Sequence, residues 1–195
     1  MPSFIMALIL QPYDPVWAND FYRLKEYLYQ QCSNSLCSFQ IEHVGSTAIL
    51  GLMAKPVLDI DIIIEDTACL NILASKLTFL GYIYKGEQGI EGRFAFRTSS
   101  AAVPYASPTR TWPAHHLYVC FADSLALRNH LCFRNALLQD SSLRDQYMAC
   151  KMMLLNAPEI NREKYTILKT DFILSVLKRV GFSNEEIALI RRQNQ

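Results

Sequence analysis

Two aspartates, Asp59 and Asp61, interrupt an otherwise aliphatic stretch at residues 57–64. Aliphatic and β-branched residues at nearly every position are typical of a strand buried on both faces, so residues 57–64 are predicted to form one. Side chains two residues apart on a strand share a face and lie about 6.6 Å apart along it, so both carboxylates can converge on one cation. Burying an ionised carboxylate without a partner costs several kcal/mol. The pair therefore predicts a bound cation, hydrogen bonds or a solvent-filled cleft.

A glycine-serine turn lies just upstream of these carboxylates. Residues 39–44 are predicted to form a strand that runs directly into Gly45 and Ser46. Gly45 permits a sharp turn and a close backbone approach. If residues 47–52 begin a helical turn, Ser46 is its N-cap, and its hydroxyl and the nearby backbone amides can hold a phosphate oxygen. Taken alone, Gly45 and Ser46 also fit a plain capped turn, but their position one strand before an Asp-x-Asp strand favours a phosphate site.

The chemistry that these residues could support is nucleotidyl transfer. Mg²⁺ prefers oxygen ligands and commonly takes one or two protein carboxylates together with phosphate oxygens. Asp59 and Asp61 supply that minimum, and the Gly45-Ser46 turn would position the phosphates that leave. The predicted reaction transfers a nucleoside monophosphate from a nucleoside triphosphate to an unknown acceptor and releases pyrophosphate.

The order of strand, Gly-Ser turn, short helix and Asp-x-Asp strand resembles the signature of the nucleotidyltransferase superfamily related to DNA polymerase beta. More narrowly, the chain resembles the GrpB family of small proteins in that superfamily. Two positions depart from the family pattern: Leu50 replaces a proline, and Asn135 replaces an aspartate that could pair with Arg134. The motifs that carry the resemblance are Tyr13-Asp-Pro-x-Trp17, Glu42-His-Val-Gly-Ser-Thr-Ala48, Ala54-Lys-Pro56, Asp59-Ile-Asp61, Leu80-Gly-Tyr82, Gly89-Ile-x-Gly-Arg-x-x-Phe96, His115-His-Leu-Tyr-Val-Cys120, His130-Leu-x-Phe-Arg134, and Tyr165 followed by Lys169.

The resemblance implies a third carboxylate on a neighbouring strand, which would hold a second metal and deprotonate the acceptor hydroxyl. The predicted strand at residues 115–121 carries a histidine there instead. We expect His116 to point into the cleft and His115 to point to the opposite face. A histidine at that place could act as a general base or bind Mn²⁺. A structural histidine at the end of a sheet fits equally well, and Glu42 is the alternative third acid.

Four basic residues are candidates for phosphate binding. Lys55 directly precedes the proline before the carboxylate strand, and Arg93 lies in a glycine-flanked segment that leads into another strand. Lys151 and Lys169 are spread, with Arg134, over three predicted helices, and the family resemblance suggests that some of these three residues face the cleft. Each of the four also fits a solvated surface charge or an ion pair. Core positions, not places in the site, are expected for four aromatic residues: Trp112, Tyr118, Phe133 and Tyr147.

Composition sets the outer limits. The chain has 195 residues, 51% of them hydrophobic, which suits one compact unit spanning 1–195. Its formal charge of +1 argues against nucleic acid or an anionic membrane as a partner. The apolar run at residues 4–10 is too short to cross a bilayer and is expected to form a first strand or a packed arm. With no signal peptide recognised, the six cysteines are expected to be reduced thiols in a cytoplasmic protein.

The pattern of elements predicts an α+β fold. A small mixed β-sheet with flanking helices, at about residues 1–122, would be followed by a helical half at about 123–195. A loop is expected at residues 99–113, where prolines and small residues gather. Helices are predicted at residues 14–31, 67–80, 125–138, 143–155, 162–180 and 184–193, and further strands at 82–84, 94–97 and 115–121.

Two functions remain open: a metal-dependent nucleotidyltransferase, or a nucleotide-binding or regulatory module of the same fold without turnover.

Overall fold

A computed structural model describes residues 10–156 and 162–193 of the chain. The expected strand or arm at residues 4–10 lies almost wholly outside this described part. The segment directly after that run is anchored, because the backbones of Gln11 and Ala54 form an isolated antiparallel bridge.

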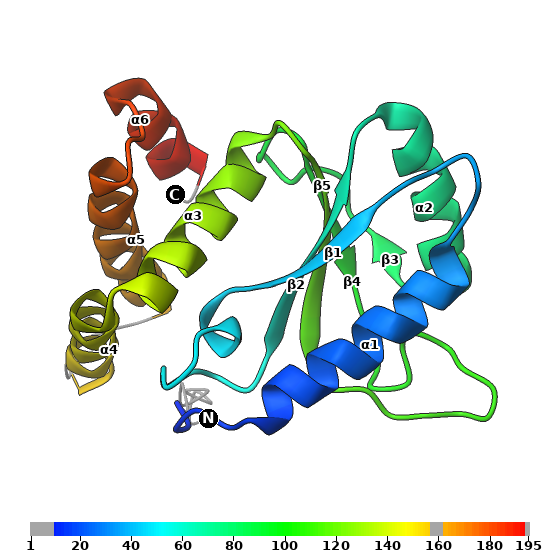
Figure 1. Ribbon diagram of the computed structural model, residues 1–195, viewed down its shortest axis with the longest axis horizontal. Helices are drawn as coiled ribbons and strands as arrows, with labels where there is room; N and C mark the ends of the chain where they lie inside the picture. Colours follow the sequence, from blue (N-terminus) through cyan, green and yellow to red (C-terminus); the bar gives the residue numbers. More distant parts are fainter. Residues whose placement is uncertain (1–9, 157–161, 194–195) are drawn as a thin grey trace, which may run out of the picture.

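A five-stranded mixed sheet forms the centre of the fold (Figure 1). Its order is β1-β2-β5-β4-β3. The two central strands β2 and β5 run parallel, and the other neighbours pair antiparallel. The expected α+β layout with a small mixed sheet is therefore confirmed. The strands are β1 (Gln40–Val44), β2 (Leu58–Ile64), β3 (Ile83–Tyr84), β4 (Arg93–Arg97) and β5 (His115–Phe121).

Helices cover both faces of this sheet. Figure 1 shows α1 (Val16–Cys32) and α2 (Thr67–Phe79) on one side and the C-terminal helices on the other. The helical half begins with α3, which lies next to the sheet, and continues away from it. The predicted helices agree with the observed ones to within two residues at every end. The C-terminal helices are α3 (Leu125–Gln139), α4 (Ser141–Asn156), α5 (Arg162–Arg179) and α6 (Asn184–Gln193).

The main hydrophobic core lies between the sheet and the helices α1 and α2. Ile60 and Ile62 of β2 pack into this core with Leu24 and Leu28 of α1. This alternation leaves the intervening positions of β2, which include both aspartates, on the opposite face. The carboxylates thus face the helical half of the molecule while the aliphatic residues between them hold the strand in place.

Helix α1 buries an apolar stripe that includes Trp17. The neighbouring apolar residue, Val16, is 45% exposed. Trp17 precedes Phe21 by four residues and Leu24 by seven, so it belongs to their stripe on a helix of 3.6 residues per turn. Val16 is rotated by about 100° from that stripe.

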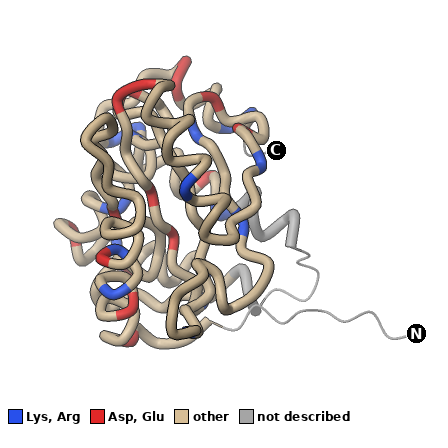
Figure 2. Tube along the Cα trace, turned by 90° about the vertical axis from the view of Figure 1, so that its right-hand side faces the viewer, with Lys and Arg blue, Asp and Glu red and all other residues tan. Residues whose placement is uncertain are grey.

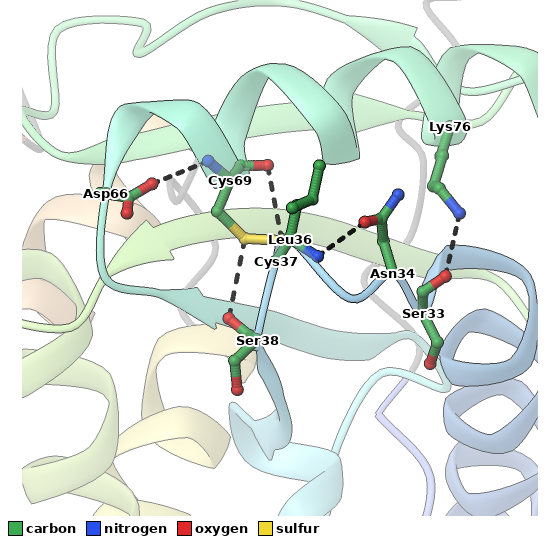
Figure 3. Close-up of a disulfide and its surroundings, with 8 residues drawn as sticks. All are labelled: Ser33, Asn34, Leu36, Cys37, Ser38, Asp66, Cys69 and Lys76. Carbon is green, nitrogen blue, oxygen red and sulfur yellow. Dashed lines mark hydrogen bonds between the residues drawn. A yellow bond between two sulfur atoms is a disulfide. The ribbon is translucent and has the colours of Figure 1, made fainter.

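The expectation of six reduced cysteines is wrong for one pair. Cys37 and Cys69 form a disulfide that links the segment before β1 to the first turn of α2 (Figure 3). The side chain of Asp66 caps this turn by accepting a hydrogen bond from the backbone N–H of Cys69, at 2.8 Å. Separated by 32 residues, the two cysteines meet only because α2 packs beside the end of α1. Free thiols remain at Cys32, Cys120, Cys132 and Cys150.

Among the helices of the described part of the chain, none has the length and apolarity needed to cross a membrane.

Candidate functional site

The strand register places both aspartates on one face of the sheet. Asp59 lies opposite His116 of β5, and Asp61 lies opposite Tyr118. On the other side of β2, Asp61 lies opposite Glu42 of β1. Residues directly opposite in a sheet point to the same face. The sheet therefore gathers two carboxylates, a histidine and a tyrosine beneath helix α3, as the alternation in the sequence predicts.

Asp61 is held by a residue that the sequence analysis did not assign to the site. Its Oδ2 atom lies 2.7 Å from Nδ1 of His130 on α3, and the Asp61 side chain has no exposed area. Burial lowers the pKa of His130, but the Asp61 carboxylate outweighs this effect and the net pKa is raised above its ordinary value of 6.5. The other oxygen of Asp61, Oδ1, is buried and has no hydrogen-bond partner among the described residues. One carboxylate oxygen is thus fixed, and the other remains available.

Arg134, one helical turn after His130, explains the fate of Glu42. Its Nη1 donates to Glu42 Oε2 at 2.7 Å and to the carbonyl oxygen of His43 at 2.8 Å. Glu42, the alternative third acid, is therefore engaged by Arg134. Asn135, which replaces the aspartate of the family pattern, still provides an acceptor: its Oδ1 accepts a hydrogen bond from Nε of Arg134 at 3.1 Å. The spacing of His130 and Arg134 by four residues puts both on one face of α3, and this was the signal in the sequence that could have identified His130.

The Gly-Ser turn touches Asp59. Gly45 has a φ of +71°, and a Cβ atom there would lie 2.8 Å from Cγ and 2.9 Å from Cβ of Asp59. Only glycine allows both this backbone conformation and the close approach of the carboxylate. Burial raises the pKa of Asp59, while His116 and Lys169 act to lower it.

Ser46 does not cap a helix as predicted. It is the first residue of a short 3₁₀ helix, Ser46–Ala48, and Gly45 occupies the cap position without a side-chain hydrogen bond. The positive φ of Gly45 moves the start of the helix by one residue. The Ser46 hydroxyl instead accepts a 3.5 Å contact from Nζ of Lys151 on α4.

Contacts from the opposite face fix the turn. The Nε2 atom of His43 lies 3.0 Å from Oγ1 of Thr47, which donates to the carbonyl oxygen of Val57 at 3.3 Å. The ring of His43 stacks on Phe21 of α1, with ring centres 4.6 Å apart. Burial, and secondarily Arg134, lowers the pKa of His43 to about 4, so it stays neutral near pH 7. His43 therefore supports the turn as a structural residue.

The predicted lysines gather on one side of Asp59. Lys151 is only 2% exposed and donates to the carbonyl oxygen of Met53 as well as contacting Ser46. Burial, and then the neighbouring charge of Lys169, lowers the pKa of Lys151 to about 7. Together with Lys55, Lys151 and Lys169 line a cavity of about 230 Å³ that also includes Asp59. We call this cavity, which His116 also lines, the lysine cavity.

A second cavity, of about 190 Å³, lies against the same aspartate. It shares Ser46, Asp59 and Lys169 with the lysine cavity but is otherwise lined by different residues, including Arg93 and His130. We call it the arginine cavity. Of the four aromatic residues expected in the core, Trp112 and Tyr147 are buried there as predicted. Three of the four also line this cavity. The three are Tyr118, Phe133 and Tyr147.

The two adjacent histidines of β5 separate as the alternation predicts. His115 is buried; its Nδ1 donates to the carbonyl oxygen of Pro113 at 2.8 Å, so its Nε2 accepts from the hydroxyl of Tyr82 at 2.7 Å. Burial lowers the pKa of His115. His116 is exposed and lies in the lysine cavity beside Asp59. The side chain that reaches the candidate site is therefore His116, and His115 is structural.

The donors present suit one magnesium ion better than two. Among the residues that the structure describes, no group of three or more His, Cys, Asp or Glu side chains could hold a metal. Two carboxylates, with Oδ1 of Asp61 buried and unpartnered in this part of the chain, still match the one or two that Mg²⁺ commonly takes beside phosphate oxygens. Opposite this pair, β5 provides His116 and Tyr118 in place of a third acid.

The mixed sheet, with its Asp-x-Asp strand beside a Gly-Ser turn, has a nucleotidyltransferase-like fold. Two solved structures of the Cid1 poly(U) polymerase share this fold, one with MgGTP bound and one with its short product ApU. Each aligns with a TM-score of 0.54, at 12% and 14% identity. The alignments cover 84% of this chain and about half of Cid1, 50% and 48%.

The chain belongs to the GrpB family: the model of this family, described as GrpB protein, matches residues 7–179. The crystal structure of the conserved protein GrpB from Enterococcus faecalis aligns with a TM-score of 0.70 at 28% identity, covering 92% of this chain and 98% of that one. The UPF0157 protein SCO7215 of Streptomyces coelicolor is 27% identical over 88% of this chain and 83% of its own length.

Proposed function

We propose that this protein is a metal-dependent nucleotidyltransferase that moves a nucleoside monophosphate from a nucleoside triphosphate to an acceptor hydroxyl. The observation that carries the proposal is the position of Asp59, which touches the Gly45 turn and lies in both cavities. A carboxylate between two cavities can serve a reaction between two ligands. The Cid1 structures, which have this fold and bind MgGTP or a nucleotide product, support the choice of ligand.

In this proposal the lysine cavity receives the triphosphate. Lys55 and Lys169, and Lys151 in its protonated form, would bring positive charge to the Ser46 turn and offset the charge of the phosphates. Each lysine is a point donor on a flexible stem, which suits phosphates whose charge is spread over several oxygens.

Asp59 and Oδ1 of Asp61 would hold Mg²⁺ or Mn²⁺, and the bound ion would neutralise charge on the phosphates. His130 would keep the Asp61 carboxylate in a fixed orientation through its 2.7 Å hydrogen bond.

The transfer itself is a displacement at the α-phosphorus. The acceptor hydroxyl oxygen forms a bond to that phosphorus, the bond from it to the α,β-bridging oxygen breaks, and pyrophosphate leaves with that oxygen. The hydroxyl proton passes to a base, for which His116 in the lysine cavity is the candidate.

The experiment is a thermal-shift titration of the full chain with each of four nucleoside triphosphates, with and without Mg²⁺ or Mn²⁺. A ligand at 100 times its Kd adds about 2.7 kcal/mol of stability. We expect a metal-dependent shift that Asp59→Asn abolishes and that Asp123→Asn, at an exposed turn position, leaves unchanged. No shift with any triphosphate and either metal would refute the proposal.

A second candidate, a nucleotide-binding module without turnover, is favoured by the histidine and tyrosine that stand opposite the carboxylates on β5. Pyrophosphate release separates the two functions. Metal-dependent binding with no pyrophosphate formed in a broad panel of hydroxyl acceptors would favour the module.

A further inference from the structure

The two cavities meet at Asp59 and share Lys169, but their other cations differ: Lys55 and Lys151 line one, and Arg93 lines the other. The Gly-Ser turn comes directly after Val44, which pairs with Asp59 near the start of β2. Arg93 pairs instead with Cys120, which is the partner of Ile63 near the end of β2. Lys55 and Lys151 thus approach Asp59 from one side and Arg93 from the other, so two anionic groups could be bound separately.

The guanidinium of Arg93 has a donor that the described part of the chain does not satisfy. Its Nε atom is buried, and no described residue accepts a hydrogen bond from it. None of the ion pairs found among the described residues includes Arg93. Leaving a buried donor unsatisfied destabilises the folded protein, and more so when the group is charged. A ligand that accepts from this guanidinium would remove the cost.

The guanidinium is also held in position. Its central carbon lies 4.5 Å from the ring centre of Tyr118, the residue that pairs with Asp61. Strand β4, which begins at Arg93, follows a turn that only glycine fits. Gly92 has a φ of +71°, and a Cβ atom there would lie 2.8 Å from Cβ of Ser124. A fixed planar fork of donors matches a carboxylate or a phosphate.

The walls of the arginine cavity indicate a small ligand. Tyr118, Phe133 and Tyr147 line it beside Arg93, which suits a planar or apolar body attached to the anionic group. Its volume of about 190 Å³ leaves room for a compact organic anion. The formal charge of +1 gives no general attraction for a polyanion.

We infer that the arginine cavity binds a small organic molecule whose carboxylate or phosphate group is held by Arg93. Under the proposed function, on which this part rests, that molecule is the acceptor. Its hydroxyl oxygen would face the α-phosphorus of the nucleotide beside Asp59, bond to it as pyrophosphate leaves, and give its proton to the base.

The test uses three probes of one shape: 4-hydroxybenzoate, 4-hydroxyphenyl phosphate and the neutral 4-hydroxybenzamide. Each is titrated calorimetrically into the full chain with Mg²⁺, with and without α,β-methylene nucleoside triphosphates, which cannot transfer. We expect at least one anionic probe to bind tenfold or more tighter than the amide. Comparing the carboxylate with the phosphate identifies the group that Arg93 selects.

Variants then assign the preference to Arg93. Arg93→Met should abolish it while changing nucleotide affinity less than twofold. Arg97→Met removes the same charge from an exposed position of the same strand and should keep the preference. Because the three probes are compared on the parent protein, the inference can fail even if Arg93→Met does not fold.

Three results would overturn the inference: equal affinity of the parent for all three probes, loss of nucleotide affinity alone in Arg93→Met, or Arg93-dependent binding of an oligoribonucleotide 3′ end in place of the small anions. Selective binding of an anionic probe without any nucleotide binding would support the anion site and refute only the proposed transfer.

Discussion

At the scale of single residues, the two aspartates of β2 differ in what holds them. Asp61 is paired with His130 and has no exposed area, whereas Asp59 lies against a glycine and lines both cavities. The alternation in the sequence puts both on one face but gives no sign of this difference. Their substitution should therefore have different effects on stability.

We predict that Asp61→Asn destabilises the metal-free protein by about 3 kcal/mol, because breaking a buried pair leaves His130 without its partner. Asp59→Asn should leave stability equal or higher, since burial already disfavours the charged form of this carboxyl. Urea unfolding without metal measures both. Equal losses in the two variants would show that Asp59 is as much a structural residue as Asp61.

The two histidines of β5 form a matched pair for a second prediction. His115→Ala should cost about 1–3 kcal/mol of stability, because it leaves the buried hydroxyl of Tyr82 without a partner. His116→Ala should leave stability unchanged, since the side chain is exposed, and should lower pyrophosphate release if it is the base. Unchanged turnover in His116→Ala would remove it from the proposed mechanism.

Lys151 gives a prediction about pH. Its pKa is lowered to about 7 in the folded protein from an ordinary value of 10.5, so between these values the unfolded chain binds a proton that the folded chain does not. The contribution of Lys151 therefore makes stability rise with pH between about 7 and 10.5, by at most about 1.4 kcal/mol per pH unit. Below pH 7 this contribution does not change with pH.

The measurement compares urea unfolding of the parent and Lys151→Met between pH 6 and pH 9.5. The difference between the two curves isolates Lys151, because the other groups that titrate are common to both. The variant should be the more stable protein at pH 6, and its advantage should shrink as pH rises. A difference that stays constant across this range would contradict a buried lysine.

At the scale of elements, the disulfide connects the start of α2 to the segment before β1 (Figure 3). Disulfides persist in oxidising environments, so this pair removes the support that reduced thiols gave to a cytoplasmic location. A disulfide that closes a loop of this length stabilises the folded protein by about 3–4 kcal/mol, because it restricts the conformations of the unfolded chain.

We predict that Cys37→Ser/Cys69→Ser loses about 3–4 kcal/mol of unfolding free energy relative to the oxidised parent. Dithiothreitol should lower the unfolding free energy of the parent by a similar amount and leave that of the variant unchanged, which controls for effects of the serines. If the reductant changes the unfolding free energy of neither protein, the disulfide contributes no net stability.

Helix α3 is the element that completes the candidate site. It carries His130 to Asp61 and Arg134 to Glu42, so one helix face engages two adjacent strands. The same helix lines the arginine cavity through Asn129 and Phe133. The site is thus built where the helical half meets the sheet.

At the scale of the whole molecule, charge is balanced. The chain has 19 basic and 18 acidic residues, and Figure 2 shows the two kinds interspersed along the trace. Proteins that bind nucleic acid through phosphates show a strong salt dependence, which requires a basic surface. The net charge of this molecule is too small to create such a surface by itself.

We predict that a 20-nucleotide single-stranded RNA binds the full chain no more tightly at 50 mM than at 200 mM salt. Fluorescence anisotropy measures this, with a basic RNA-binding protein as the positive control. A steep loss of affinity between these salt concentrations would reveal a local basic surface and revive nucleic acid as the acceptor.

The sequence alone determined the strands, the helices and the face on which Asp59 and Asp61 lie, because these depend on local periodicity and on the two-residue repeat of a strand. It also indicated the Gly-Ser turn and separated His115 from His116, since neighbouring residues of a strand point to opposite faces.

Only the tertiary structure decided which residues meet. The bond of His130 to Asp61, the pairing of Arg134 with Glu42 and the disulfide join positions 69, 92 and 32 residues apart. It also decided which buried donors are unsatisfied among the described residues, as Nε of Arg93 is, and which cations are buried, as Lys151 is. The physical reason is that burial and charge pairing depend on how whole elements pack, and residue spacing along the chain does not encode that packing.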